Sequence, residues 1–165
     1  MYLNPVTKFN IKYDTDIYNK IHPLQVETGC IIKPLYIRWQ YEGNEYGFSA
    51  YDDQPITSIY LSQDFILVQY TQNEKLPEHH LFLYNLRKEV IKLIKTPELI
   101  SRETRKYATK GCIEALGNTI YYGGKKYLKV SIGPSISEEH YFEQQLLDLN
   151  TFNFHPAFAN PVYYR

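Results

Sequence analysis

Histidines are the first side chains in this sequence that could do chemistry, as metal ligands or as general bases. None of the five has a partner at the i, i+4 spacing of a helical metal pair or at the H-x-H spacing of a strand pair. His79 and His80 are adjacent, so on a strand they would point to opposite faces. His22 and His155 each precede a proline, which is typical of turns. We therefore predict no metal site.

The two cysteines could supply a nucleophile or a redox pair. Cys30 and Cys112 lie far apart in the sequence and form no C-x-x-C motif. Each follows a glycine and precedes an isoleucine, an apolar context in which cysteine behaves as a small hydrophobic residue. We expect both to pack in the core, and their sparse use favours a reducing, cytoplasmic compartment.

Paired carboxylates could serve glycoside hydrolysis, and the candidates are Asp52 with Asp53 and Glu138 with Glu139. Adjacent residues on a strand project apart, so solvated loops are the simpler interpretation. The sequence contains no G-x-S-x-G, Walker or G-x-G-x-x-G motif. We predict a protein that is not an enzyme and needs no cofactor. The alternative is a hydrolase whose site is assembled from distant residues, for example His140 with Glu138 or Glu139.

Charge is balanced overall but unevenly distributed along the chain. The formal net charge is zero, which argues against a protein whose main task is to bind nucleic-acid phosphates. Residues 40–86 carry seven carboxylates and one cation, whereas residues 87–110 carry eight cations and three carboxylates. The basic segment could complement the acidic one, even head to tail between copies. No apolar stretch reaches the length of a membrane span, and the first ten residues do not have the pattern of a signal peptide.

Short apolar runs between turn residues predict β-strands, and these strands must position any functional site. The chain has 165 residues and 17 tyrosines, and aromatic side chains favour strands. We predict one domain, residues 1–165, with an all-β fold or a mainly β fold with one short helix. The arrangement is an antiparallel meander, with an incomplete propeller-like or sandwich form. The expected strands are Leu35 to Tyr41, Gly47 to Tyr51, Ile56 to Leu61, Phe65 to Thr71, Leu81 to Leu86, Val90 to Lys95, Thr119 to Tyr122 and Lys126 to Ile132.

Turn and cap residues predict where several of these elements begin and end. Glu42-Gly43-Asn44 and Gly123-Gly124 tolerate positive φ, and the second pair predicts a tight hairpin. Thr96-Pro97-Glu98 would open a helix that Gly111 closes. Residues 137–149 alternate as a strand does, and we expect a strand there.

Three segments that end on proline hint at a degenerate repeat. They are residues 11–23, 83–97 and 147–156, and each pairs a short apolar run with a return to a proline. Such a unit resembles the outer half of a propeller blade, although any antiparallel meander can produce it.

The segment from residue 39 to residue 53 interleaves aromatic rings with carboxylates, and such surfaces suit a basic protein partner. The predicted partner-binding residues are Trp39, Tyr41, Glu42, Glu45, Tyr46, Tyr51, Asp52 and Asp53. The sequence thus favours a stoichiometric protein-binding module, such as an intracellular immunity protein that occludes a toxin or enzyme. One alternative is a β-domain that binds carbohydrate or another small ligand. The other is that the segment is a solvated hairpin whose tyrosines only pack the sheet.

Overall fold

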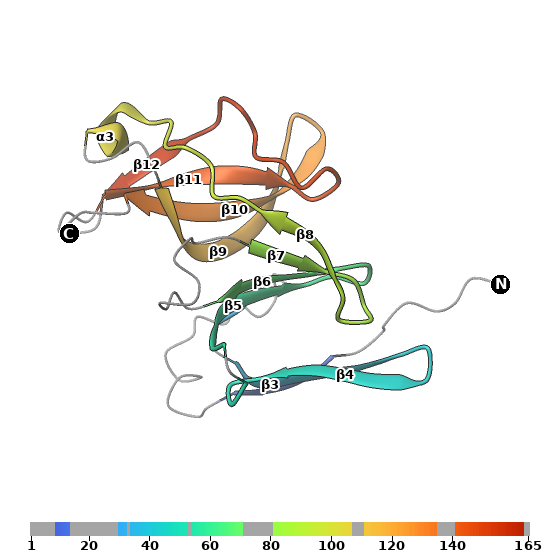
Figure 1. Cartoon of the computed structure of the whole chain (residues 1–165). Helices are drawn as coiled ribbons and strands as arrows, with labels where there is room; N and C mark the ends of the chain where they lie inside the picture. The colour runs from blue at the N-terminus through green and yellow to red at the C-terminus, as the bar shows by residue number, and fades with distance from the viewer. Residues whose placement is uncertain are drawn as a thin grey trace.

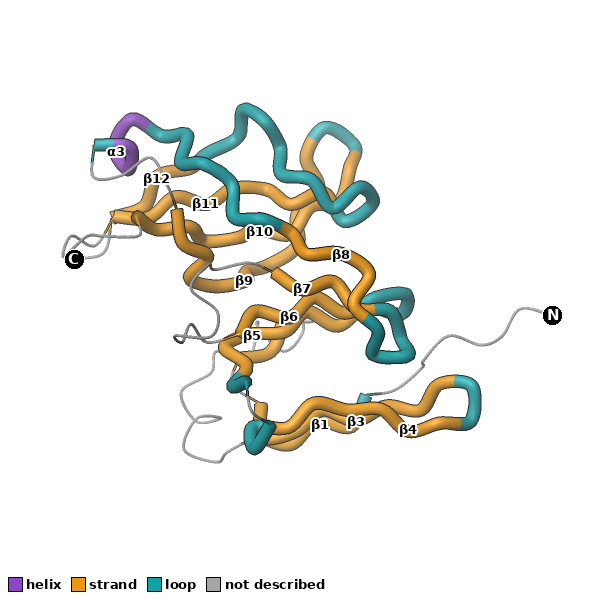
Figure 2. The backbone as a smooth tube through the Cα atoms, in the orientation of Figure 1, coloured by secondary structure: helices purple, strands orange, loops and turns teal. Residues whose placement is uncertain are grey.

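The computed structural model describes residues 9–13, 30–32, 34–52, 54–70, 81–106, 111–134 and 141–163. These residues form antiparallel strands and one short helix, so the predicted all-β class is confirmed. Figures 1 and 2 show the strands as three stacked layers, with the five-stranded sheet in the middle. In the described residues the sheets contain three, five and four strands and share hydrophobic cores, which agrees with the predicted sandwich form.

Each sheet is an antiparallel set in which neighbours are mostly consecutive in the chain. The three-stranded sheet has the order β1 (Asn10–Tyr13), β3 (Pro34–Tyr41) and β4 (Asn44–Ser49). The central sheet has the order β2 (Cys30–Ile32), β5 (Ile56–Leu61), β6 (Ile66–Tyr70), β7 (Leu81–Tyr84) and β8 (Val90–Ile94). The four-stranded sheet has the order β12 (Asn160–Tyr163), β11 (Tyr141–Asp148), β10 (Lys125–Pro134) and β9 (Gly111–Tyr122).

The middle of the central sheet is covered on both faces, because β5, β6 and β7 are mostly buried. β6 reads Ile-Leu-Val-Gln-Tyr, and its side chains alternate between two hydrophobic cores. The first core, against the four-stranded sheet, contains Tyr60, Leu67, Leu81, Leu83, Ile94, Leu99, Ile113, Leu116, Leu128, Val130, Ile132, Leu147 and Leu149. The second core, against the three-stranded sheet, contains Ile31, Ile37, Trp39, Phe48, Ile56, Ile59, Ile66, Val68, Tyr84 and Leu86.

Buried polar side chains join the layers at defined points. The Gln69 amide accepts a hydrogen bond from the Ser58 hydroxyl and donates one to the carbonyl of Ile113, 2.9 Å away. This bond links β6 of the central sheet to β9 of the four-stranded sheet. Because a buried amide without a partner is costly, the pairing fixes how the two sheets sit against each other.

Both predicted glycine turns are confirmed. Tyr41 pairs with Asn44 across a two-residue turn in which φ is +49° at Glu42 and +80° at Gly43. Gly123 and Gly124 have φ of +57° and +78° and close the β9–β10 hairpin. Positive φ at both central positions gives the twist that suits a two-residue hairpin.

The one short helix lies in the segment where it was expected, but it begins later than Thr96 and is much shorter. The helix is a single turn, α3 (Arg102–Arg105), whose N-cap is Ser101, and residues 95–100 form no regular helix or strand. The reason is a distant carboxylate: Glu143 on β11 accepts the backbone N–H groups of Ile100 and Ser101. This pairing holds residues 95–100 in an irregular conformation, which the local capping residues do not predict. Gly111 starts β9 instead of ending a helix, and residues 107–110 lie outside the described residues.

The proposed repeat has no matching structural unit in the described chain. Residues 83–97 contain the end of β7 and all of β8, whereas residues 147–156 contain the end of β11 and an isolated bridge from Leu147 to Phe154. Most of the first segment, residues 14–23, lies outside the described residues. The strand expected over residues 137–149 is confirmed over residues 141–148 as β11, and residues 137–140 lie outside the described residues.

Candidate protein-binding surface

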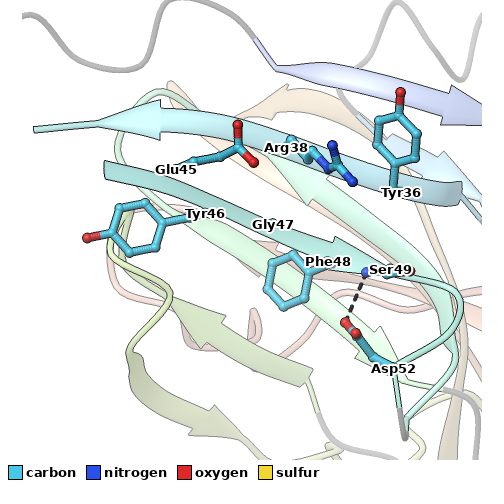
Figure 3. A pocket seen from close by; sticks show the side chains of 8 residues that line it. All are labelled: Tyr36, Arg38, Glu45, Tyr46, Gly47, Phe48, Ser49 and Asp52. Carbon is cyan, nitrogen blue, oxygen red and sulfur yellow. Dashed lines mark hydrogen bonds between the residues drawn. The ribbon is translucent and has the colours of Figure 1, made fainter. Parts of the chain in front are cut away.

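The β3–β4 hairpin carries most of the predicted partner-binding residues, and its side chains divide between two faces. Ile37 pairs with Phe48 and Trp39 with Tyr46, and these side chains face the second core. Tyr36, Arg38 and Glu45 project from the opposite face, as Figure 3 shows. The strict alternation follows from strand geometry, in which neighbouring side chains point to opposite sides.

Trp39 belongs to the core, and the expectation that it contacts a partner is corrected. Its side chain is 1% exposed and its indole N–H donates to the carbonyl of Leu86 at 2.8 Å. Its ring packs against Phe48 and stacks on Tyr46, with centroid distances of 5.7 and 6.0 Å. Trp39 therefore fastens the hairpin to the central sheet.

Tyr41 and Tyr46 are partly buried and pack against the second core. For these two rings, the structure favours the interpretation that the tyrosines pack the sheet. Their aromatic area stiffens the hairpin, and little of it is available to another molecule.

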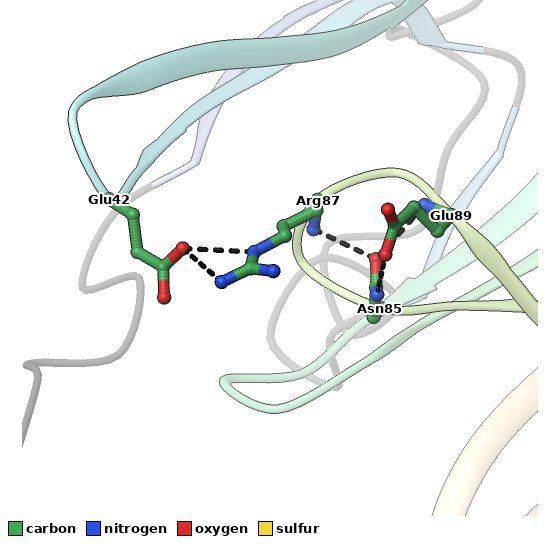
Figure 4. Close-up of polar contacts among 4 residues, drawn as sticks. All are labelled: Glu42, Asn85, Arg87 and Glu89. Carbon is green, nitrogen blue, oxygen red and sulfur yellow. Dashed lines mark hydrogen bonds and ion pairs between the residues drawn. The ribbon is translucent and has the colours of Figure 1, made fainter.

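Glu42 lies at the hairpin tip but is engaged within the chain. One of its oxygens accepts hydrogen bonds from Nε and Nη2 of Arg87, at 2.9 and 2.6 Å (Figure 4). The Arg87 turn is shaped by Asn85, whose Oδ1 accepts the backbone N–H groups of Arg87 and Glu89. The hydrogen bond and the negative charge of Glu42 raise the pKa of Arg87. The acidic and basic segments of the sequence thus meet here, inside one chain.

The remaining predicted residues that the structure describes, Glu45, Tyr51 and Asp52, are exposed, and we call them the acidic rim. Tyr51 is 87% exposed, the highest value among the large hydrophobic side chains described. The turn that presents it is ordered by Ser49, whose hydroxyl accepts the N–H of Tyr51 at 3.2 Å. Asp52 in turn accepts the N–H of Ser49 at 2.9 Å. Asp53 lies outside the described residues.

A hollow of about 300 Å³ lies beside the acidic rim, along β4 (Figure 3). Gly47 lies in its lining at a point where the two strands approach closely, since a Cβ at this position would lie 2.7 Å from the carbonyl oxygen of Ile37. Its lining residues are Tyr36, Arg38, Glu45, Tyr46, Gly47, Phe48, Ser49 and Asp52. Five of these residues were not predicted to bind a partner: Tyr36, Arg38, Gly47, Phe48 and Ser49. Tyr36 and Arg38 lie on the outer face of β3, with the Arg38 guanidinium 4.7 Å from the Tyr36 ring centroid. The alternation with buried Ile37 and Trp39 is the signal that places them outward.

Asp52 also influences the edge of the second core. The hydroxyls of Tyr70 and Tyr84 lie 2.6 Å apart. Burial raises the pKa of Tyr70, and the Tyr84 hydroxyl and the negative charge of Asp52 add to the effect. Tyr70 therefore stays neutral at this end of the hairpin.

The other chemistry-bearing residues form no competing centre in the described chain. His155 lies in a turn, where its Nδ1 accepts the N–H groups of Ala157 and Phe158 at 3.2 and 3.1 Å. Burial and the charge of Glu114 raise the pKa of the free Cys112 thiol, which disfavours a nucleophilic thiolate. Among the described residues no three of His, Cys, Asp and Glu gather as a metal site requires. His22, His79, His80, His140, Glu138, Glu139 and the side chain of Cys30 lie outside the described part.

No protein-family model and no curated protein sequence matches this chain. One solved structure has a similar fold: a chain in the structure of Tne2 in complex with Tni2. The TM-score is 0.54 and the identity 7%, over 97% of this chain and 99% of that chain. At this identity the likeness is one of fold, and it extends over nearly the whole of both chains. In the described residues, no helix has the length and apolar character needed to cross a membrane.

Proposed function

We propose that this chain is a non-enzymatic protein-binding module that docks its acidic rim on a basic surface of another protein. The observation that carries the proposal is Tyr51, a large aromatic side chain that is 87% exposed and directly precedes Asp52, an exposed acidic residue, in the sequence. Leaving such a ring in water has no benefit for folding, whereas at an interface it buries a large area with little loss of side-chain entropy.

The attachment of the β3–β4 hairpin to the rest of the fold also supports a protein-binding role. The hairpin is held to the central sheet by the Trp39 indole at one point and by the Glu42–Arg87 ion pair at the tip. A surface that is already ordered loses little entropy on binding, so more of the contact energy appears as affinity. An exposed Tyr51 ring between carboxylates, on a hairpin that is held in place, is typical of a protein that binds its partner in a fixed stoichiometry.

Charge defines the partner's chemistry. Glu45 and Asp52 are exposed, and Asp53 follows in the sequence. Carboxylates at the rim of an interface speed the approach of a basic partner, and added salt weakens that attraction. We infer a partner with a basic patch or cleft, and inhibition of that partner by occlusion.

An intracellular immunity protein, which protects its own cell from a toxin, is the specific role that we propose. It requires one protein-binding surface and no catalytic set. The similar fold was determined in a complex with another protein, which agrees with a protein partner for this one. We place the function inside the cell, where the chain would meet its toxin or enzyme.

Co-expression tests the proposal directly. The chain is expressed together with the protein encoded by the adjacent reading frame, and growth, complex formation and stoichiometry are measured. We expect rescue of growth and a one-to-one complex. Tyr51→Ala together with Asp52→Lys should weaken that complex by roughly a hundredfold, since an exposed aromatic anchor and a reversed charge both act on binding.

Asp64→Lys is the matched control. Asp64 is an exposed carboxylate in the β5–β6 turn, at the other end of β5 from residue 52, so the change in net charge matches that of Asp52→Lys. We expect unchanged rescue and affinity. Equal loss of affinity in Asp52→Lys and Asp64→Lys would show that only net charge matters, and retention of binding in Tyr51→Ala with Asp52→Lys would remove the acidic rim from the interface.

A further inference from the structure

A second surface, on a different sheet from the acidic rim, has its own pattern of exposed apolar side chains. β8 lies at the end of the central sheet, and among the described strands it pairs only with β7. Three of its residues, Val90, Ile91 and Leu93, are 54%, 58% and 42% exposed. An edge strand that pairs on one side only, as β8 does among the described strands, and that exposes apolar side chains is a template for pairing with another strand.

A hollow of about 420 Å³ adjoins β8 on the side of the first core. Its walls are residues 92–95 of the strand region and residues 152–154 of the loop after β11. The aromatic wall is held in place, because Phe152 packs edge-on against Phe65 with a centroid distance of 4.9 Å. The Lys92 ammonium lies 3.5 Å from the carbonyl oxygen of Phe152 and spans the two walls.

The backbone at Phe152 carries a conformation that a non-glycine residue rarely adopts, with φ of +56°. Asp148 enforces it: its carbonyl accepts the N–H of Phe152 at 2.8 Å, and its carboxylate accepts the N–H groups of Asn150 and Thr151. Such strain persists where the surroundings fix it, and it gathers at binding sites. The loop thus presents a preformed wall to the hollow.

The charges beside β8 indicate which kind of segment could bind there. Lys92 and Lys95 are exposed on or just after β8, and both line the hollow. The neighbouring Glu89 carboxylate is already bonded to the Asn85 amide at 2.6 Å. A second copy of β8 would bring the same cations against each other, which disfavours self-pairing. Carboxylates on the incoming strand would instead complement Lys92 and Lys95.

We propose that β8 accepts, by strand addition, an extended segment of another protein in which acidic and apolar residues alternate. Main-chain hydrogen bonds to the free edge give affinity, and the hollow beside residues 92–95 takes alternate side chains and gives specificity. The proposal goes beyond the docking of the acidic rim, because it concerns the opposite charge and another sheet.

Selection from a random peptide library displayed on phage tests this proposal, with the whole chain as the target. We expect enrichment of sequences that alternate Asp or Glu with Val, Ile or Phe. Affinities of the selected synthetic peptides are then measured on variants. Lys92→Glu together with Lys95→Glu should weaken binding by roughly tenfold or more, and each single change should weaken it less.

Arg102→Glu together with Lys106→Glu is the matched control for charge. Both residues are exposed and lie in or next to α3, far from β8 in Figure 1. This variant should bind the peptides as the native chain does, and melting temperatures show that each variant is folded. The proposal is overturned if no sequence is enriched, if basic sequences are enriched, or if the β8 variants bind as well as the control. A dimer that the β8 variants abolish would likewise overturn it, since the occupant would then be a second copy.

Discussion

Glu143 is the most unusual residue in the molecule, a carboxylate with no exposed surface and no cation among its hydrogen-bond partners in the described chain. It accepts the N–H groups of Ile100 and Ser101 at 2.7 and 2.8 Å, the Thr104 hydroxyl at 2.5 Å and the Gln145 amide at 2.7 Å. Burial alone would raise its pKa, but these hydrogen bonds lower it below the ordinary value of 4.5. Glu143 therefore holds α3 and the preceding segment as an ion.

Replacing Glu143 by Gln should destabilise the fold by about 3 kcal/mol, because an amide NH₂ would face donors that need an acceptor. The lowered pKa also sets the pH dependence. The carboxylate stabilises the fold fully above its ordinary pKa of 4.5, and this contribution is lost as the pH falls through the lower folded value. Chemical denaturation measured from pH 7 downwards should show a steeper loss of stability in the native chain than in Glu143→Gln.

Glu103→Gln is the control for this experiment, because Glu103 is exposed on the same helix turn. Its free energy of unfolding and its pH profile should match those of the native chain. If Glu143→Gln were as stable as the native chain at pH 7, the carboxylate would not be the group that anchors α3.

The elements show which parts of the fold local sequence can specify. β5 has the predicted bounds, and β3, β6, β8 and β10 differ from prediction by a few residues at most, because each is an apolar run closed by turn residues. β9 begins at Gly111, well before the predicted Thr119, and β12 was not predicted. β12 contains a proline and is mostly exposed at the sheet edge, so its strand character depends on pairing with β11.

Trp39→Phe tests the attachment of the β3–β4 hairpin to the central sheet. The smaller ring stays in the second core, but the carbonyl of Leu86 loses its indole donor. We expect a loss of about 1 to 3 kcal/mol in the free energy of unfolding, since a buried acceptor would be left without a partner. Denaturation by urea measures this loss.

Tyr46→Phe provides the comparison, because it keeps the ring that stacks on Trp39 and removes only a hydroxyl from a partly buried side chain. Its effect should remain within about 0.5 kcal/mol. If Trp39→Phe were as mild as Tyr46→Phe, the indole hydrogen bond would not hold the hairpin to the central sheet.

At the scale of the whole molecule, the central sheet contributes side chains to both hydrophobic cores of the described residues, so each outer sheet shares a core with it. We therefore expect one cooperative unfolding transition, in keeping with the prediction of a single domain. Trp39 is the only tryptophan and reports on the second core through its fluorescence. Its transition should coincide with that of the far-ultraviolet circular dichroism, which reports on all strands. Separate midpoints would mean that the three-stranded sheet unfolds on its own.

The candidate surface was only partly predictable for a physical reason. Sequence identifies a segment rich in rings and carboxylates, but burial decides which of them are available. Trp39 and Tyr46 pack inward because the hairpin lies against the central sheet, and Glu42 is engaged by Arg87 across 45 positions of the chain. Tyr51 and Asp52 lie in the turn after β4, outside both cores, and so remain exposed.

Hydrogen–deuterium exchange on the complex tests the central claim most directly. The chain is compared alone and bound to the partner obtained by co-expression, and amide protection is followed by residue. We expect the amides of residues 44–52, around the acidic rim, to become protected in the complex, with little change in the β9–β10 hairpin. Protection confined to the four-stranded sheet, with residues 44–52 exchanging as in the free chain, would contradict it.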